Sequence, residues 1–198
     1  MNNLREKILN EYCGISPLLE KIEAKLKNGR VILAIDGGSA SGKTTLAALL
    51  CELYSATVFH MDDFFLPLNM RTQKRLSEVG GNVDRERFEK EVLLPLSQGN
   101  DISYRRFDCP TKSFNEPALI TPKSLIIIEG AYSMHPQLQK YYDFSVFLEI
   151  DAEKQKSRIL KRNTKELANR FFTEWIPLEN TYFEKMDIKS KCDLVISI

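Results

Sequence analysis

A glycine-rich segment with the sequence GGSASGKTT follows a short apolar run near the N-terminus. Gly37, Gly42, Lys43 and Thr44 match the pattern GxxxxGK(S/T). In such a loop backbone N–H groups surround phosphate oxygens, and glycines permit the close approach. We expect Lys43 to reach the β- and γ-phosphates of ATP and the Thr44 hydroxyl to hold Mg²⁺. The predicted nucleotide-binding residues are Gly37, Gly38, Ser39, Ala40, Ser41, Gly42, Lys43, Thr44 and Thr45.

The predicted metal site needs an acidic group beside Thr44, and we expect it at the end of a neighbouring strand. Glu129 directly follows the apolar residues 125–128. Its oxygens would reach Mg²⁺ directly or through water, since this ion usually keeps several waters; a solvated carboxylate or a turn cap is the alternative. Asp36 precedes the glycine-rich loop, and we expect its carboxylate to accept hydrogen bonds from the loop backbone. Its charge could also act on the metal.

Phosphoryl transfer requires alignment, charge neutralisation and a proton acceptor beside the attacking hydroxyl. Asp62 and Asp63 follow a second strand candidate, residues 57–60, within the sequence HMDDFF. One of them could orient and deprotonate the hydroxyl. Two adjacent side chains rarely face the same way, so we expect Asp62 to be catalytic and Asp63 to be structural.

Five short apolar runs alternate with helical segments and would position these groups. Such runs are typical of buried parallel strands. The pattern predicts an α/β fold of the P-loop NTPase type, with a five-stranded parallel sheet, helices on both faces and a lid. The expected strands are residues 31–35, 57–60, 125–128, 144–150 and 194–198.

The remaining segments predict helices and an insert. Residues 4–27 have helical spacing interrupted near Gly14 and Pro17, which indicates two short helices or one broken helix. We expect a helix over 84–94, loops and short strands over 101–122, and a charged helical stretch from 153 to about 170. The predicted organisation is an N-terminal helical segment (1–29) and a kinase domain (30–198), with an acceptor-side insert at about 64–122 and a lid at about 153–175.

Composition narrows the function classes. Lys and Arg total 28 against 27 for Asp and Glu, and this balance argues against a dedicated nucleic-acid surface. The four cysteines are scattered without a CxxC pair, which disfavours zinc. No run of 18 apolar residues appears, and the charged N-terminus lacks the apolar core of a signal peptide. We therefore expect a cytoplasmic enzyme that does not bind membranes.

The order of five segments resembles the uridine kinases and their relatives among P-loop small-molecule kinases. These segments are GGSASGKTT, HMDDFF, GGNVDRERF, Tyr-x-x-Phe-Asp-Cys and IIIEG, and the resemblance runs from about residue 31 to 198. It implies that Asp62 is the catalytic aspartate facing a ribose 5′-hydroxyl. It also implies that Asp84 binds the ribose hydroxyls and that Glu129 lies near the metal. From the residues alone, Asp84 is predicted to be a helix N-cap, with Arg87 three positions on.

Two departures from this family concern the acceptor. Phe107-Asp108 stands where relatives commonly have Tyr-Asp, although we expect Phe107 still to contact the substrate. The histidine that helps uridine kinases to recognise the pyrimidine has no clear counterpart, and Lys112 lies close to where it would align. Both changes weaken the case for uridine and leave open an acceptor such as nicotinamide riboside or pantothenate.

A basic stretch follows the fourth predicted strand and corresponds to a lid. Arg158 and Arg162 are four residues apart and therefore share a helix face. The resemblance implies that lid arginines clamp phosphates; a solvated basic face is the alternative. We expect Arg158 to bind the nucleotide, Arg162 to act in transfer and Arg170 to contact the substrate. His60, which lies within a predicted strand, is interpreted as structural.

These residues together predict an ATP:alcohol phosphotransferase that uses ATP and Mg²⁺ and phosphorylates a small-molecule hydroxyl. A nucleoside such as uridine is the first expected acceptor. The rival from another class is a nucleotide-dependent switch protein that phosphorylates nothing. Asp62 separates the two in part, because a switch protein orders a water and does not place a carboxylate against an organic hydroxyl. The oligomeric state stays open, and a homo-oligomer is one alternative.

Overall fold

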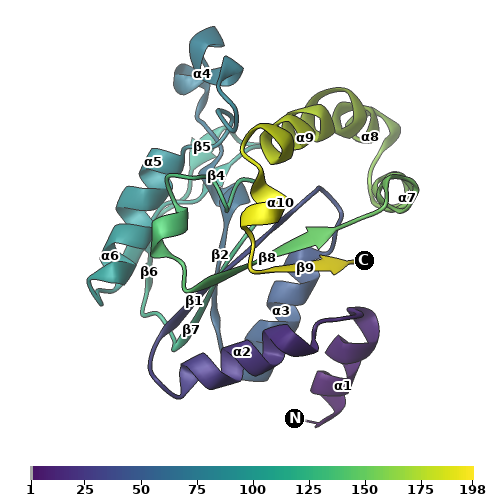
Figure 1. Cartoon of the computed structure of the whole chain (residues 1–198). Helices are drawn as coiled ribbons and strands as arrows, with labels where there is room; N and C mark the ends of the chain where they lie inside the picture. Colours follow the sequence, from purple (N-terminus) through teal and green to yellow (C-terminus); the bar gives the residue numbers. More distant parts are fainter. Residues whose placement is uncertain (1) are drawn as a thin grey trace.

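The fold is built on one five-stranded parallel sheet, described here in a computed structural model that covers residues 2–198 (Figure 1). Its strand order is β2-β7-β1-β8-β9, and every neighbouring pair is parallel. All five predicted strands are confirmed, with ends that differ by at most two residues. They are β1 (Val31–Gly37), β2 (Thr57–His60), β7 (Leu125–Glu129), β8 (Phe144–Glu149) and β9 (Leu194–Ser197).

Alternating residues of the central strand enter two separate cores. In β1, Val31, Leu33 and Ile35 pack into one hydrophobic cluster, whereas Ile32 and Ala34 pack into the other. Successive side chains of a strand point to opposite faces, so a strand buried on both faces must be apolar throughout. This explains the continuous apolar runs in the sequence.

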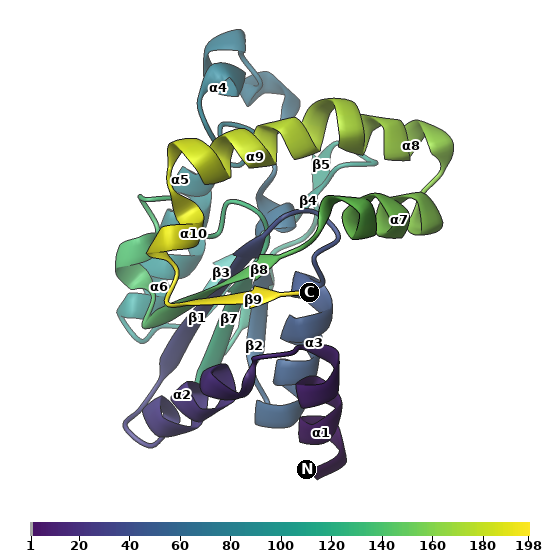
Figure 2. The same ribbon diagram turned by 45° about the vertical axis from the view of Figure 1, so that its right-hand side comes forward.

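The first face of the sheet is covered by three helices (Figure 2). The N-terminal segment forms two helices, as one of the sequence alternatives predicted, and they pack beside the helix that follows the glycine-rich loop. The three are α1 (Asn2–Glu11), α2 (Ser16–Leu26) and α3 (Lys43–Tyr54).

The second face is covered by two groups of helices (Figures 1 and 2). The predicted helix over 84–94 runs on to Ser97 and contains one π-helical turn. Pro95 has no N–H with which to continue the α-helical ladder, and the wider turn directly precedes it. The helices are α5 (Arg85–Phe88), π-helical η3 (Glu89–Leu93), α6 (Leu94–Ser97), α9 (Ile176–Lys185) and α10 (Ile188–Lys191).

Between β2 and β7 the chain forms short elements, as predicted, beyond the carboxyl end of the sheet and over its second face. Two antiparallel pairs, β3 with β6 and β4 with β5, lie within this segment. A small hairpin carrying α4 projects from the body of the molecule (Figure 1). The elements are η1 (Met61–Phe64), η2 (Leu68–Met70), α4 (Gln73–Ser77), β3 (Ile102–Tyr104), β4 (Phe107–Asp108), β5 (Ser113–Phe114), β6 (Ala118–Ile120) and, after β7, η4 (Gln139–Tyr141).

The chain after β8 forms a helical arm, as the charged stretch from 153 to about 170 predicted. It consists of two helices, α7 (Ala152–Arg162) and α8 (Lys165–Arg170), followed by π-helical η5 (Phe171–Trp175). Asn163 between them is extended, with φ −124° and ψ 159°. The Thr164 side chain accepts a hydrogen bond from the Leu167 N–H and thereby caps a new helix. Capping by Thr164 favours a second helix start over continuation.

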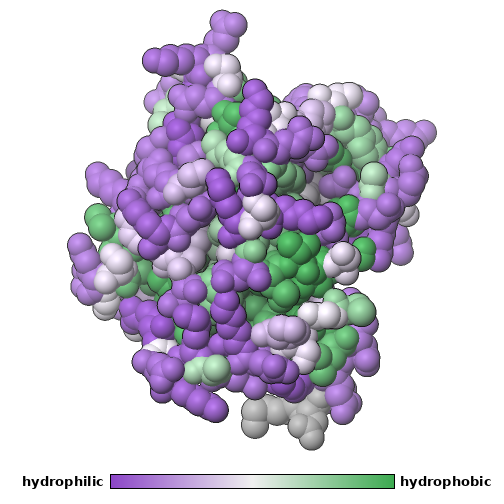
Figure 3. Space-filling view, in the orientation of Figure 1, coloured by the Kyte–Doolittle hydropathy of each residue, from purple (hydrophilic) through white to green (hydrophobic). Residues whose placement is uncertain are grey.

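The face of the molecule that Figure 3 shows is largely polar. Figure 3 shows an apolar patch over β9, the edge strand on which Val195 is 37% exposed. Across residues 2–198, no helix is both long enough and apolar enough to cross a membrane.

Candidate active site

The phosphate-binding loop joins β1 to α3. Gly37 has φ +143°, and a Cβ placed on it would lie 2.3 Å from the Leu148 carbonyl oxygen of β8. Gly42 has φ +98° and precedes the first residue of α3. Only glycine satisfies both demands of Gly37, a left-handed backbone and close approach to a neighbouring strand. The local fold therefore explains the glycines of the motif.

Lys43 begins α3, and its side chain lies back over the loop. Its Nζ donates hydrogen bonds to the carbonyl oxygens of Gly37 at 2.8 Å and Gly38 at 2.9 Å. The residue is only 9% exposed. A lysine in this place delivers a positive charge to the mouth of the loop, beside the N-terminus of a 12-residue helix.

Thr44, Glu129 and His60 come together where β2 and β7 end. The Thr44 hydroxyl donates to Glu129 Oε1 at 3.0 Å, and His60 Nδ1 lies 2.5 Å from the same oxygen. His60 and Glu129 are paired in register across the two strands. The hydrogen bond to Glu129 is the largest cause that raises the pKa of His60, against desolvation. His60 therefore helps to orient Glu129, which agrees with the structural role expected from the sequence.

The donor set at this point fits Mg²⁺ better than a softer metal. A hydroxyl and a carboxylate are the oxygen ligands that Mg²⁺ prefers, and the ion completes its shell with water and phosphate oxygens. Among the described residues, no group of three or more His, Cys, Asp or Glu is arranged to hold a metal alone. The metal role of Thr44 and Glu129 stays a prediction.

The adjacent residues Asp62 and Asp63 have different surroundings. Asp63 is 4% exposed, and its carboxylate contacts Arg106 Nε at 2.7 Å and accepts a hydrogen bond from the Tyr104 hydroxyl at 2.9 Å. Asp62 is exposed, and its carboxylate accepts no hydrogen bond from the part of the chain that the structure describes. Neighbouring protein still removes much of its hydration, and this desolvation raises the pKa of Asp62, opposed by Lys43. Asp63 therefore has a structural role, as expected, and the catalytic role of Asp62 stays a prediction.

Asp84 and Phe107 lie in the segment between β2 and β7. Asp84 caps α5, as the residues alone predicted: its carboxylate accepts a hydrogen bond from the Arg87 N–H at 3.1 Å. Phe107 is 3% exposed and packs edge-on against Phe114. The contacts of both residues with an acceptor stay predictions.

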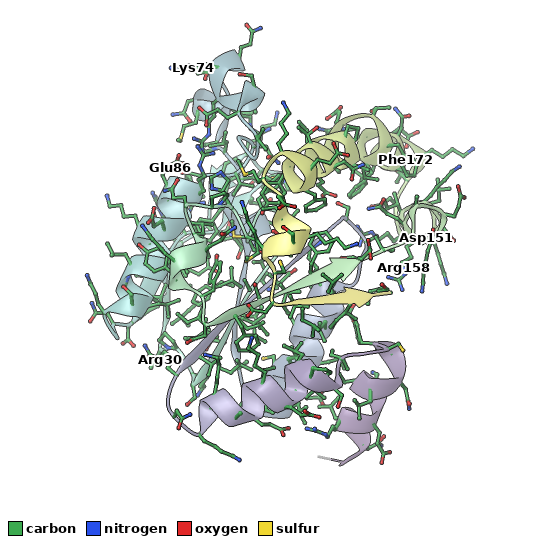
Figure 4. The ribbon with its side chains drawn as sticks, in the orientation of Figure 1. Arg30, Lys74, Glu86, Asp151, Arg158 and Phe172 are labelled. Carbon is green, nitrogen blue, oxygen red and sulfur yellow. The ribbon has the colours of Figure 1, made fainter. Side chains whose placement is uncertain are left out.

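A cavity of about 640 Å³ opens on the α3 side of the phosphate-binding loop. Figure 4 shows Arg158 on the side of α7 that faces the sheet. Arg158 donates to the Ala40 carbonyl oxygen at 3.0 Å, and Arg162 lies one turn further along the same face. Arg170 is placed elsewhere: it pairs with Glu174 and does not line this cavity. The cavity is lined by Glu11, Tyr12, Ala40, Ser41, Gly42, Lys43, Thr44, Thr45, Arg158, Lys161, Arg162 and Ile198.

Two groups near the loop are missing from the predicted site residues. Tyr12 of α1 is 4% exposed and donates a hydrogen bond to the Gly42 carbonyl oxygen at 3.1 Å. Glu179 of α9 is 6% exposed and accepts hydrogen bonds from Ser39. No sequence motif marked either residue, because each reaches the loop only through tertiary packing.

Asp36 has the structural role expected of it. Its fully buried carboxylate accepts hydrogen bonds from the backbone N–H groups of Gly37 and Met134 and from the Tyr182 hydroxyl. Burial raises the pKa of Asp36 to about 6. The group joins the end of β1 to the loop after β7 and to α9.

Comparison with known proteins supplies the family. The model of the phosphoribulokinase/uridine kinase family matches residues 32–170. The chain belongs to this family. A uridine kinase from Staphylococcus haemolyticus is 27% identical over 183 residues, which cover 83% of this chain and 86% of that protein. Uridine kinase-like protein 4 of Arabidopsis thaliana is 29% identical over 84% of this chain, and the match spans only 35% of that protein.

Solved structures agree on the fold. A protein described as a possible uridine kinase from Bacillus stearothermophilus matches with a TM-score of 0.64 and 23% identity, over 90% of this chain and 98% of that one. A D-glycerate 3-kinase from Cryptococcus neoformans matches with a TM-score of 0.55 and 15% identity, over 76% of this chain and 78% of that one. The family match and these structures together agree with the P-loop fold described above.

Proposed function

We propose that this kinase transfers the γ-phosphoryl group of ATP to the hydroxyl of a small molecule, most readily the 5′-hydroxyl of a nucleoside such as uridine. The observation that carries the proposal is the contrast between Asp62 and Asp63. A buried, paired carboxylate such as Asp63 serves the fold, whereas the exposed and unbonded Asp62 is available to a substrate. The charges of Lys43 and Glu129 both act on the Asp62 carboxylate: Lys43 lowers its pKa and Glu129 raises it.

In this proposal Asp62 accepts the proton of the acceptor hydroxyl as the oxygen attacks the γ-phosphorus. The bond between the γ-phosphorus and the bridging oxygen breaks, and ADP leaves with the electron pair. Lys43 and the loop N–H groups bind the β- and γ-phosphates. Thr44 and Glu129 would hold Mg²⁺, which when bound neutralises phosphate charge.

The remaining residues bind the two substrates. Arg158 and Arg162 face the cavity beside the loop and would contact the nucleotide and the transferred group. Asp84 and Phe107 would contact the acceptor, and Arg170 would approach it when the lid closes. The corresponding division is an N-terminal segment (1–29) and a kinase domain (30–198), with an acceptor-side insert (64–122) and a lid (153–175).

The acceptor is the open part of this proposal, because the departures at Phe107 and Lys112 also suit another hydroxyl compound, of the nicotinamide riboside or pantothenate type. The test is ADP release from ATP and Mg²⁺ across nucleosides, nicotinamide riboside, pantothenate and other alcohols, with the phosphorylated product identified by mass. We expect one acceptor class to raise ADP release well above background, and Asp62→Asn to lose that increase. Tight nucleotide binding without stimulation by any acceptor would favour the switch-protein alternative.

A further inference from the structure

Helix α9 returns from the helical arm across the start of the phosphate-binding loop, as Figure 2 shows. Two of its buried side chains, three residues apart on one face, bond this region of the chain. Glu179 Oε2 accepts a hydrogen bond from the Ser39 N–H at 2.8 Å, and Oε1 accepts one from the Ser39 hydroxyl at 2.5 Å. The Tyr182 hydroxyl donates to Asp36 at 2.8 Å. Helix α9 is therefore bonded to Ser39 in the loop and to Asp36, which directly precedes the loop.

Helix α7 holds the same loop from the other side. Gln155 Nε2 donates to the Ser39 carbonyl oxygen at 2.8 Å, and Arg158 donates to the Ala40 carbonyl oxygen at 3.0 Å. The N–H, hydroxyl and carbonyl groups of Ser39 are thus all bonded by side chains of α7 and α9. Ala40 has φ +62°, an unfavourable value for alanine that the surrounding contacts maintain.

A carboxylate as buried as that of Glu179 is expensive to keep unless it is bonded. Desolvation is the largest cause that raises the pKa of Glu179, and the nearby Lys43 charge and the Ser39 hydrogen bonds oppose it. An apolar residue would remove this cost, but it would also remove the bonds to Ser39. The fold therefore keeps the Glu179 carboxylate at the loop although its desolvation is unfavourable.

We infer that Glu179 is a positioning residue, which fixes the phosphate-binding loop to the helical arm through Ser39. The inference rests on the proposed function, since it assigns a task within the same nucleotide site. The residues that follow Ser39 in the loop line the cavity, so the directions of their N–H groups depend on where Ser39 is held. Because coupling free energy is reciprocal, a nucleotide that orders the loop also orders α7 and α9.

The test is the dissociation constant of ADP with Mg²⁺, measured by calorimetry for the wild type, Glu179→Ala, Glu179→Gln and Ser39→Ala. Glu179→Ala leaves a buried N–H without its acceptor, and we expect ADP binding to weaken about tenfold or more. Glu179→Gln keeps an amide oxygen for the Ser39 N–H and should recover most of that loss. In steady state, Glu179→Ala should raise the KM for ATP more than the KM for the acceptor.

Glu89→Gln is the matched control, because Glu89 is also a hydrogen-bonded carboxylate but lies away from the loop, against Gln137 and Tyr141. It should lower the melting temperature and leave ADP affinity unchanged. Adding Ser39→Ala to Glu179→Ala should cost less than the sum of the two single changes, since both remove one shared bond.

Wild-type ADP affinity in folded Glu179→Ala protein, or full additivity with Ser39→Ala, would overturn the inference. If Glu179→Ala does not fold, Ser39→Ala and Glu179→Gln give the same comparison. Failure of the proposed function would look different: the wild type would bind ADP, but no acceptor would be phosphorylated.

Discussion

Replacing each of the adjacent aspartates by asparagine should separate catalysis from stability. Asp62→Asn removes a proton acceptor that bonds nothing in the described protein, whereas Asp63→Asn removes the charge from a buried and paired group. The two substitutions are chemically identical and occupy neighbouring positions. Any difference between them therefore reports the environment of each carboxylate.

The expected loss for Asp62→Asn lies in the rate. A positioned general base contributes about 10²- to 10⁴-fold, which corresponds to about 3–5 kcal/mol in the activation free energy. The free energy of unfolding should change by less than about 0.5 kcal/mol. The fold already disfavours the ionised form of Asp62, as its raised pKa shows, so a neutral side chain is tolerated.

The expected loss for Asp63→Asn lies in stability. A hydrogen bond to a charged group contributes about 1.5–3 kcal/mol, and asparagine can still accept from the Tyr104 hydroxyl. Arg106 is itself 66% exposed on its side chain, which weakens its part of the pair. We therefore expect a net loss of about 2 kcal/mol. For a chain of this size that corresponds to a fall of about 4–8 °C in the melting temperature.

The assay pairs ADP release at saturating ATP and acceptor with a thermal melt of each variant. Asp63→Asn should keep turnover within about tenfold of the wild type when it is measured well below its melting temperature. If Asp62→Asn keeps wild-type turnover, or if both variants lose turnover equally while folded, the assignment of the base to Asp62 is wrong.

Three further predictions concern the loop and the two faces of the sheet. Tyr12→Phe removes the hydrogen bond to the loop and should raise the KM for ATP about threefold to tenfold. The control is Tyr54→Phe, which loses a hydrogen bond to α2 away from the cavity and should leave this KM unchanged. Equal effects of the two variants on the KM would refute a nucleotide role for α1. Gly37→Ala forces a Cβ to within 2.3 Å of the Leu148 carbonyl oxygen, so calorimetry of the purified variant should show that nucleotide binding is abolished. Nucleotide binding at wild-type strength would show instead that β8, which carries Leu148, can shift. Hydrogen bonds from neighbours lower the pKa of Glu89 from 4.5 to about 2, so its carboxylate stabilises the fold above pH 4.5 and this contribution is lost as the pH falls toward 2. In urea unfolding, Glu89→Gln should lower the free energy of unfolding by about 1 kcal/mol at pH 7, and the wild type and the variant should be equally stable near pH 2.

Sequence patterns were sufficient for the inner strands because β1 and β7 are buried along their whole length and carry almost unbroken apolar runs. Thr57–His60 begins and ends where the sequence predicted a strand, and the other four strands differ by only one or two residues. The charged arm was harder, because helix periodicity cannot show where a helix restarts. There the capping bond of Thr164, a contact over three residues, divides the predicted helical stretch into two helices.

The sequence by itself predicted the phosphate-binding loop, a structural Asp63 beside a catalytic Asp62, and the resemblance to the family that the comparisons show. Each of these depends on residue types at short, fixed spacing, which local backbone geometry makes meaningful. Only the tertiary structure showed that Asp63 pairs with Arg106 and Tyr104, that His60 orients Glu129, and that Glu179 holds Ser39. Glu179 and Ser39 are 140 residues apart, and no periodicity or motif relates positions that meet only when the sheet and its helices pack together.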